Sequence, residues 1–382
     1  MAFLAHTLKG VKQSAIRLMT RECQRVGGIN LAQGLCDLPV PPFVLAGAEQ
    51  AMRQGHNIYT VPEGCRELRE TIAQKLARDN GLNVDPLSEI VVTVGVTGAY
   101  SSTLKALLNP GDGVLVMEPY YGYHVHIAKV AGLQTYTLTL TAPDFRLDEQ
   151  ALREALNPAI RAVVVCTPGN PSGKVFDRAE LEIIARVAHE HDLLVITDEI
   201  YEYFTYDGLH HLSPATVGDL YPRTVSMMGF SKVFSITGWR LGYVVAPEPL
   251  AHAVMLANDS TCICAPAPLQ YGVIAGLNAA PEFFTQRRAD FQRKREMLHA
   301  AVTAAGMRAD KPRGSYYILA DISALGYPSA WDAAMDLLEN KGVATVPGTA
   351  FFHGPEGENY LRICFAKEDE VLAQACERLS SF

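Results

Sequence analysis

The sequence predicts an α/β fold, in which helices cover both faces of a mostly parallel sheet and a smaller α+β lobe follows. Between about residues 90 and 245, short apolar runs alternate with longer amphipathic stretches. These runs are too uniformly apolar for strands that have one face in water. After about residue 283 the pattern changes to a long charged helix with separate strands and helices. The runs that we predict as strands of the large sheet are 89–94, 113–117, 161–166, 193–197, 224–228 and 243–246.

The same patterns divide the chain into three parts. Residues 1–42 carry no strong strand signal and end in a proline-rich stretch, so we expect this N-terminal segment to pack on the small lobe. Residues 43–283 form the predicted large domain, and residues 284–382 form the small C-terminal domain. In the latter we expect a helix that begins near 283, strands at 315–321 and 360–365, and a helix at 331–341.

Composition excludes several classes of function. The 382 residues are 48% hydrophobic, enough for a large core, and the net charge is -8 without basic runs, which argues against nucleic acid or an anionic membrane as partner. No apolar run is long enough to span a membrane, and the N-terminus lacks an export signal, so we expect a cytoplasmic protein. The eight scattered cysteines match neither a metal site nor a disulfide framework, and we expect them to be reduced.

The most informative stretch is residues 227–243, where Lys232 lies among small and apolar residues and Arg240 follows eight positions later. An apolar pocket that holds other cations lowers the pKa of an ammonium group and supplies the neutral amine that imine formation requires. The planar fork of Arg240 suits a phosphate. Together they predict a cofactor with one carbonyl and one phosphate, which is pyridoxal 5′-phosphate. The alternative is that Lys232 lies along the surface with its amine in water.

Two further candidates follow the strand at 193–197. Asp198 would be a buried carboxylate in need of a partner, and the protonated pyridine nitrogen of the cofactor would provide one. Tyr201, three residues later, could bring its phenol to the same ring. The alternative for Asp198 is a cap on the next helix.

Two turns could complete the cofactor site. The loop 167–173 contains two prolines and two glycines and would aim Asn170 at a ring oxygen, although turn asparagines often bond to their own backbone. The turn 93–98 joins a strand to a helix, where the backbone N–H groups of Val96 and Thr97 could bind a phosphate. Many such turns bind nothing.

An aromatic and an arginine are the last candidates from the residues themselves. Tyr121 could stack on the cofactor ring or be an ordinary core aromatic. In the strand 360–365, alternation places Arg362 on the face opposite its apolar neighbours. It is either solvated or grips a substrate α-carboxylate through a bidentate contact.

In this order, and together with Ile58-Tyr59-Thr60-Val61-Pro62-Glu63-Gly64 and Gln33-Gly34, these motifs resemble the class I/II aminotransferases of pyridoxal-enzyme fold type I. The resemblance covers nearly the whole chain. It implies a seven-stranded, mostly parallel sheet in a large cofactor-binding domain, and a homodimer with shared active sites.

The resemblance also implies a role for each candidate. Lys232 would hold the cofactor as an internal aldimine, with Asp198 on the pyridine nitrogen and Tyr201 on the ring oxygen as further catalytic residues. The remaining implied contacts are Asn170 on the ring oxygen, Tyr121 on the ring, Arg240, Val96, Thr97 and Ser231 at the phosphate, Tyr59 at the neighbouring subunit's phosphate, and Gly34, Asn170 and Arg362 at the substrate.

Three positions depart from the family pattern. Gly229 stands where many members carry a phosphate-binding serine, so that contact is missing or comes from Ser231 or Ser235. Cys36 replaces a common proline near the substrate. Thr97 stands where an aspartate-specific branch has a lysine, which removes that particular reason to expect aspartate as substrate.

The resemblance implies ping-pong transfer of an amino group from an α-amino acid to a 2-oxo acid, in which Lys232 acts as general base and acid. The overall likeness favours neutral, bulky or sulfur-containing side chains. The nearest alternative is a β-eliminating lyase on sulfur-bearing amino acids, because fold and motifs are shared. A non-catalytic cofactor-binding module is a further alternative, but we find no DNA-binding segment that would accompany it in a transcription regulator.

Overall fold

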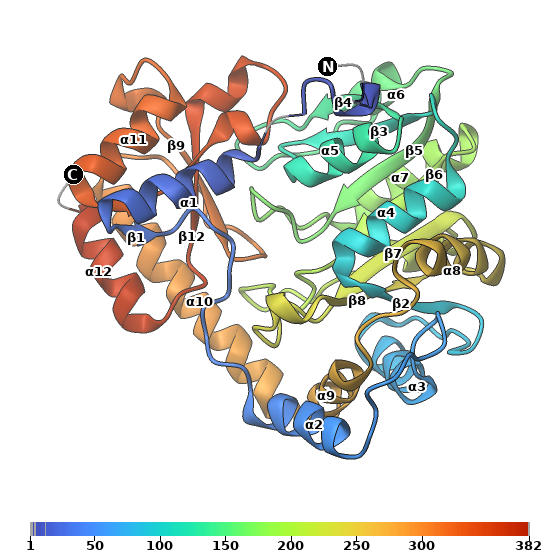
Figure 1. Ribbon diagram of the computed structural model, residues 1–382. Helices are drawn as coiled ribbons and strands as arrows, with labels where there is room; N and C mark the ends of the chain where they lie inside the picture. Colours follow the sequence, from blue (N-terminus) through green and yellow to red (C-terminus); the bar gives the residue numbers. More distant parts are fainter. Residues whose placement is uncertain (1–2, 4, 12, 381–382) are drawn as a thin grey trace.

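The computed structural model describes residues 3, 5–11 and 13–380, and Figure 1 shows a large lobe and a small lobe joined by the long helix α10 (Pro281–Ala304). Residues 1, 2, 4 and 12 of the predicted N-terminal segment and 381–382 of the predicted C-terminal domain lie outside the described residues. Within the described ranges, every helix is too short or too polar to cross a membrane.

In the described part of the chain, seven strands form the sheet of the large lobe, in the order β2-β8-β7-β6-β5-β3-β4. All neighbours pair in parallel except β8, which is antiparallel to both β2 and β7. This is the mostly parallel α/β sheet that the sequence predicts. The strands are β2 (Ile90–Val94), β3 (Gly113–Glu118), β4 (Gln134–Thr139), β5 (Ile160–Cys166), β6 (Leu194–Asp198), β7 (Thr224–Gly229) and β8 (Leu241–Val245).

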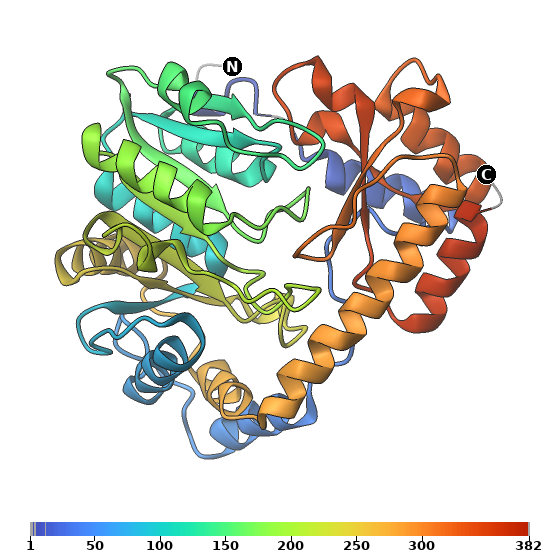
Figure 2. The ribbon, with the colours of Figure 1, turned by 180° about the vertical axis from the view of Figure 1, so that it is seen from behind.

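Helices cover both faces of this sheet, as the uniformly apolar strands require. In β2, Val91 packs in the cluster that contains residues of α4, α5 and α8, whereas Ile90 and Val92 pack on the opposite side with α3 and α9. Figure 2 shows α7 on the face turned away from α4. The helices of this lobe are α2 (Pro42–Arg53), α3 (Arg66–Lys75), α4 (Gly95–Leu107), α5 (Gly122–Val130), α6 (Glu149–Ala155), α7 (Arg178–Glu190), α8 (Glu248–Cys262) and α9 (Ala267–Leu277).

The small lobe is built on a three-stranded antiparallel sheet in the order β11-β12-β9. Its apolar residues, such as Ile318 and Ile363, are fully buried against helices α11 and α12. The second predicted domain limit, between 283 and 284, falls inside α10, which therefore contributes to both lobes. The elements are β9 (Tyr317–Asp321), β11 (Val346–Pro347), β12 (Tyr360–Cys364), α11 (Ala330–Lys341) and α12 (Asp369–Ser380).

The N-terminal segment crosses from one lobe to the other (Figure 1). Helix α1 (Ala15–Val26) lies on the small lobe, and β1 (Ile29–Asn30) pairs in parallel with β10 (Val343–Ala344). The chain then descends to α2, whose Phe43 contacts Phe283 of α10 edge-on with the ring centroids 5.2 Å apart. The pairing of β1 with β10 holds the residues that follow α1 on the small lobe, and the Phe43 contact joins α2 to α10.

Candidate active site

A cavity of about 510 Å³ lies where the carboxyl ends of the parallel strands face the small lobe. In open α/β sheets this edge is the usual ligand site. Eleven of the twelve predicted site residues line it, and the exception is Tyr59, which lies outside with 75% of its surface exposed. The lining candidates are Gly34, Val96, Thr97, Tyr121, Asn170, Asp198, Tyr201, Ser231, Lys232, Arg240 and Arg362.

Lys232 follows the end of β7, and its amine points into the cavity, where Nζ donates to the backbone oxygen of Gly34 at 3.2 Å. The rings of Tyr201 and Tyr316 lie 5.9 Å and 5.8 Å from the amine. Burial lowers the pKa of the Lys232 amine to about 8, against the weaker opposing effect of nearby acidic groups. The neutral, nucleophilic form of the amine is therefore much more abundant near neutral pH than it is for an ordinary lysine.

Asp198 is the last residue of β6, and its carboxylate is nearly buried. One oxygen, Oδ1, accepts a bond from the backbone N–H of Ile200 at 3.3 Å within a turn. The next helical segment begins only at Pro214, so the alternative that Asp198 caps the next helix is wrong. The other oxygen, Oδ2, lies 3.0 Å from Nε2 of His124 on α5. His124 is held edge-on by Tyr100 and Tyr121, with centroids 5.2 Å and 5.5 Å away. The carboxylate is thus fixed in position and facing the cavity.

The start of α4 and Arg240 form a cradle for an anion. Gly95 has a φ of +69°, and a Cβ there would come within 2.6 Å of Nη2 of Arg240. The missing side chain lets the guanidinium lie close to the first turn of a 13-residue helix, beside Val96 and Thr97. Arg240 itself is fixed by a bond from Nη1 to the backbone oxygen of Thr237 at 3.0 Å. Free N–H groups, the helix dipole and a guanidinium together favour a phosphate.

Arg362 lies on the small-lobe side of the cavity and is fully buried, so the alternative that it is solvated is wrong. Nη1 donates to Oδ1 of Asn170 at 3.0 Å, and Nη2 donates to the backbone oxygen of Ala32. Its guanidinium stacks 4.4 Å from the ring centroid of Tyr317. Nε has no hydrogen-bond partner among the described residues. Because Oδ1 of Asn170 is occupied by Arg362, the amide nitrogen of Asn170 is left to donate to a ligand.

Tyr317, which we did not predict as a site residue, shapes the same wall. Tyr317 bonds through its hydroxyl to that of Tyr201 at 2.9 Å. A Cβ at Gly34 would lie only 1.9 Å from the Tyr317 oxygen, so a glycine is required there. Burial raises the pKa of the Tyr201 phenol well above its usual value, which keeps the hydroxyl protonated and able to donate.

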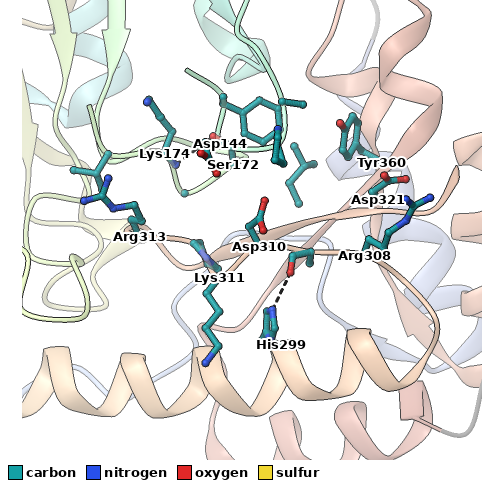
Figure 3. A pocket seen from close by; sticks show the side chains of 18 of the residues that line it. Asp144, Ser172, Lys174, His299, Arg308, Asp310, Lys311, Arg313, Asp321 and Tyr360 are labelled. Atoms are coloured by element: carbon teal, nitrogen blue, oxygen red, sulfur yellow. Dashed lines mark hydrogen bonds between the residues drawn. The ribbon is translucent and has the colours of Figure 1, made fainter. Parts of the chain in front are cut away.

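A larger hollow of about 700 Å³ lies elsewhere between the lobes (Figure 3). Charged side chains of both signs surround it, among them Arg308, Asp310 and Lys311. Its half-buried lysine, Lys174, is already bound by both oxygens of Glu180 at 2.5 Å and 2.7 Å. None of the predicted site residues lines this hollow, so the candidate chemistry is concentrated in the smaller cavity.

Residues 26–379 match the family model of the class I and II aminotransferases. The chain belongs to this family. It is 35% identical over 386 residues to the aspartate/prephenate aminotransferase of Thermus thermophilus, covering 99% of this chain and 98% of the relative. It is 34% identical over 374 residues to a probable N-succinyldiaminopimelate aminotransferase of Mycobacterium tuberculosis, covering 95% and 94%.

Solved structures agree with this assignment. The structure of N-succinyldiaminopimelate aminotransferase from Mycobacterium tuberculosis superimposes with a TM-score of 0.95 at 32% identity, over 99% of both chains. An Escherichia coli structure with a methionine aminotransferase function gives a TM-score of 0.95 at 29% identity over all of both chains. The fold is therefore the predicted fold type I, and the protein is an aminotransferase. The β-eliminating lyase is not favoured.

The departure of this aminotransferase at Gly229 has a structural reason. A Cβ at position 229 would lie 2.7 Å from Cδ1 of Ile200 and 2.8 Å from Cγ2 of Val96, so the serine of other members has no room. Of the two serines that could replace it, Ser231 lines the cavity. Ser235 does not, and its hydroxyl is bonded to Arg287 and to Cys36.

Proposed function

We propose that this aminotransferase binds pyridoxal 5′-phosphate in the cavity at the strand ends and transfers amino groups there in two half-reactions. The observation that carries the proposal is a lysine amine with a lowered pKa, Lys232, in one cavity with the fixed carboxylate of Asp198 and the anion cradle of Arg240. These three groups suit the carbonyl, the ring nitrogen and the phosphate of the cofactor.

The cofactor contacts follow from this arrangement. Arg240, Ser231 and the N–H groups of Val96 and Thr97 would hold the phosphate. Asp198 would keep the ring nitrogen protonated, and His124 would hold that carboxylate in place. When bound, pyridoxal phosphate supplies an electron-withdrawing ring that stabilises negative charge at the substrate Cα.

Around the ring, the Asn170 amide nitrogen and the Tyr201 hydroxyl would donate to its phenolate oxygen, and Tyr121 would pack against the ring. This arrangement explains why Tyr201 must stay protonated, because only a protonated phenol can donate to an anionic oxygen.

Arg362 and Gly34 would bind the substrate α-carboxylate. The Arg362 fork is buried, braced by Asn170 and Tyr317, and rigid, so it can orient the Cα–H bond toward the Lys232 amine. In the first half-reaction the neutral amine would take the Cα proton of the amino acid and deliver it to the cofactor carbon, and in the second it would carry a proton from that carbon to Cα of the new amino acid. An amino acid would leave as a 2-oxo acid, and a second 2-oxo acid would take up the amino group.

We propose a homodimer in which Tyr59 reaches the cofactor phosphate of the neighbouring subunit. Tyr59 is 75% exposed, and its apolar neighbours Ile58 and Val61 are also exposed, which is unusual unless another chain covers them.

We place the enzyme in the cytoplasm, since all eight cysteines, each within the described residues, are free thiols. We also propose that the large domain begins after residue 42 and ends at residue 283.

The names of the relatives mention aspartate and N-succinyldiaminopimelate, which carry an amino group that can be donated, and prephenate, a 2-oxo acid that can accept one. For this chain we propose an α-amino acid donor and a 2-oxo acid acceptor.

The test is a half-reaction without acceptor. Protein supplied with pyridoxal phosphate is mixed with one amino acid, and the cofactor absorbance, the 2-oxo acid and ammonia are followed. We expect the aminated cofactor and one 2-oxo acid per site, with no ammonia. Lys232→Ala should abolish the reaction, whereas Lys129→Ala, an exposed lysine of α5, should not. Release of ammonia while the cofactor stays unaminated would contradict the proposal and indicate a lyase.

A further inference from the structure

Among the residues that the structure describes, four lysine and arginine side chains line the cavity, and three of them, Lys232, Arg240 and Arg362, already have proposed roles. The fourth is Arg17, which lies on α1 and is solvent-exposed. Its Nε donates to the hydroxyl of Tyr123 at 3.5 Å, a long and weak contact. Among the described residues no carboxylate pairs with Arg17. Its guanidinium is therefore available to a ligand in the cavity.

The charge around Arg17 is not balanced by the protein. Asp198 is the one carboxylate among the described residues that line the cavity, and it is engaged by His124. A second hollow of about 600 Å³ adjoins the first and shares Arg17 and Tyr123 with it. Its described lining contains no Asp or Glu either, and it adds a further cation, Lys105. A negatively charged group that enters beside Arg17 therefore meets positive charge that no described carboxylate of the second hollow balances.

His126 also lines the second hollow. Burial, followed by the nearby charge of Lys129, lowers the pKa of His126. It is therefore neutral at physiological pH and adds no charge of its own. The positive potential at the wall between the two hollows comes from Arg17, with Lys105 farther along α4.

We propose that Arg17 binds a carboxylate on the side chain of the substrate, so that the enzyme selects acidic amino acids and their dicarboxylic 2-oxo acids. The inference rests on the proposed function, in which Arg362 takes the α-carboxylate. Arg17 and Arg362 lie on different elements, α1 and β12, and line one cavity, so a dicarboxylate can engage both. This replaces the expectation of a neutral or sulfur-containing side chain, which rested on overall likeness alone.

The position of Arg17 also suits selection among side chains. A planar fork can bind a carboxylate through two parallel hydrogen bonds, whereas the amide of a neutral analogue offers one uncharged acceptor. Because Arg17 is solvated when no ligand is present, the ligand-free protein avoids the free-energy cost of burying an unpaired charge. Acidic and neutral substrates of equal size should therefore differ in affinity.

The first experiment compares kcat/KM of the half-reaction for L-glutamate and L-glutamine in the holoenzyme. Wild type should favour glutamate, and Arg17→Gln should reduce the glutamate-to-glutamine ratio at least tenfold. The matched control is Arg21→Gln, one turn along α1, where an arginine does not line the cavity and the ratio should be unchanged. A wild-type preference for glutamine, or an equal loss for both substrates in Arg17→Gln, would overturn the assignment.

A binding measurement removes the dependence on turnover. Calorimetric titration of the holoenzyme with glutarate and with pentanoate compares a dicarboxylate with a monocarboxylate of the same chain length. Wild type should bind glutarate at least tenfold more tightly, and Arg17→Gln should lose that preference while Arg21→Gln keeps it. Equal binding of the two acids by wild type would refute the role of Arg17. If no amino acid reacts at all with wild type, the proposed function itself has failed, and this inference fails with it.

Discussion

The clearest quantitative consequence of the fold concerns the proton on Lys232 in the cofactor-free protein. Burial lowers the pKa of this amine from 10.5 to about 8. At pH 7 the neutral fraction is then about 9%, compared with about 0.03% at the ordinary pKa, a gain of roughly 300-fold in reactive amine. The shift requires the enclosed position under Tyr201 and Tyr316, so it should vanish on unfolding.

The assay is competitive labelling of amines between about pH 6 and pH 11 with a reagent that attacks neutral amines, followed by mass spectrometry of the Lys232 peptide. We expect a labelling midpoint near pH 8 for Lys232 in the folded protein. In urea the midpoint should rise to the usual lysine value of about 10.4. A folded-state midpoint as high as that in urea would refute the argument that burial activates the amine.

The same shift makes a prediction about stability. Between pH 8 and 10.5 the unfolded chain holds more protons at Lys232 than the folded chain, so folding becomes more favourable as pH rises through this window. Below about pH 8 the destabilisation is complete, at about 3 kcal/mol or less. Lys232→Met should therefore stabilise the cofactor-free protein at pH 7 and lose this advantage above pH 10.5, as measured by urea unfolding.

Three further changes test other parts of the molecule. Arg362→Lys removes the bidentate fork and should lower kcat/KM at least tenfold, about 1.4 kcal/mol, for all amino acids; an effect confined to acidic substrates would contradict its role at the α-carboxylate. Lys75→Met leaves the buried carboxylate of Glu202 without its charged partner, with only the Asn80 amide, among the described residues, bonded to it, and should cost about 3–5 kcal/mol in urea unfolding. If the double variant Lys75→Met/Glu202→Leu is no more stable than Lys75→Met alone, the unpaired carboxylate of Glu202 is not the cause of the loss in stability. Mixing Tyr59→Phe subunits with Lys232→Ala subunits should give more activity than either homodimer. One site of the mixed dimer would then contain both an intact Lys232 and an intact Tyr59 from the other subunit. No gain in activity would argue against active sites that are shared between subunits.

The sequence predicts the central sheet well because six of its strands are buried on both faces and therefore read as continuous apolar runs. β4 is the strand that this reasoning missed. It lies at the edge of the sheet, beside β3 alone, and its sequence, Gln134 to Thr139, alternates threonine with other residues and is largely half-exposed. β2, the strand at the other edge, is almost wholly buried, whereas β4 is not covered in this way, so continuous hydrophobicity reveals β2 and cannot reveal β4.

The candidate site follows the same logic. Lys232, Asp198 and Asn170 stand just beyond or at the ends of parallel strands, and the carboxyl ends of such strands meet at one edge, so sequence position alone brings them together. His124 and Tyr317 could not be found in this way. In the sequence, His124 is an ordinary residue of a helix and Tyr317 is an ordinary aromatic residue of a strand. Only the packed structure brings His124 to Asp198 and Tyr317 to Tyr201.

Gly229 shows how a departure from a family pattern can be a matter of packing. The space that a serine side chain would need is filled by Ile200, which follows Asp198 by two residues, and by Val96, whose N–H belongs to the proposed phosphate cradle. A serine at 229 would therefore push on the two elements that hold the ring nitrogen and the phosphate. The proposed phosphate site in this chain relies instead on Arg240, Ser231 and the first turn of α4, and Gly95 allows Arg240 to approach that turn. The glycines at 95 and 229 act together, one admitting the guanidinium and the other leaving the cradle undistorted.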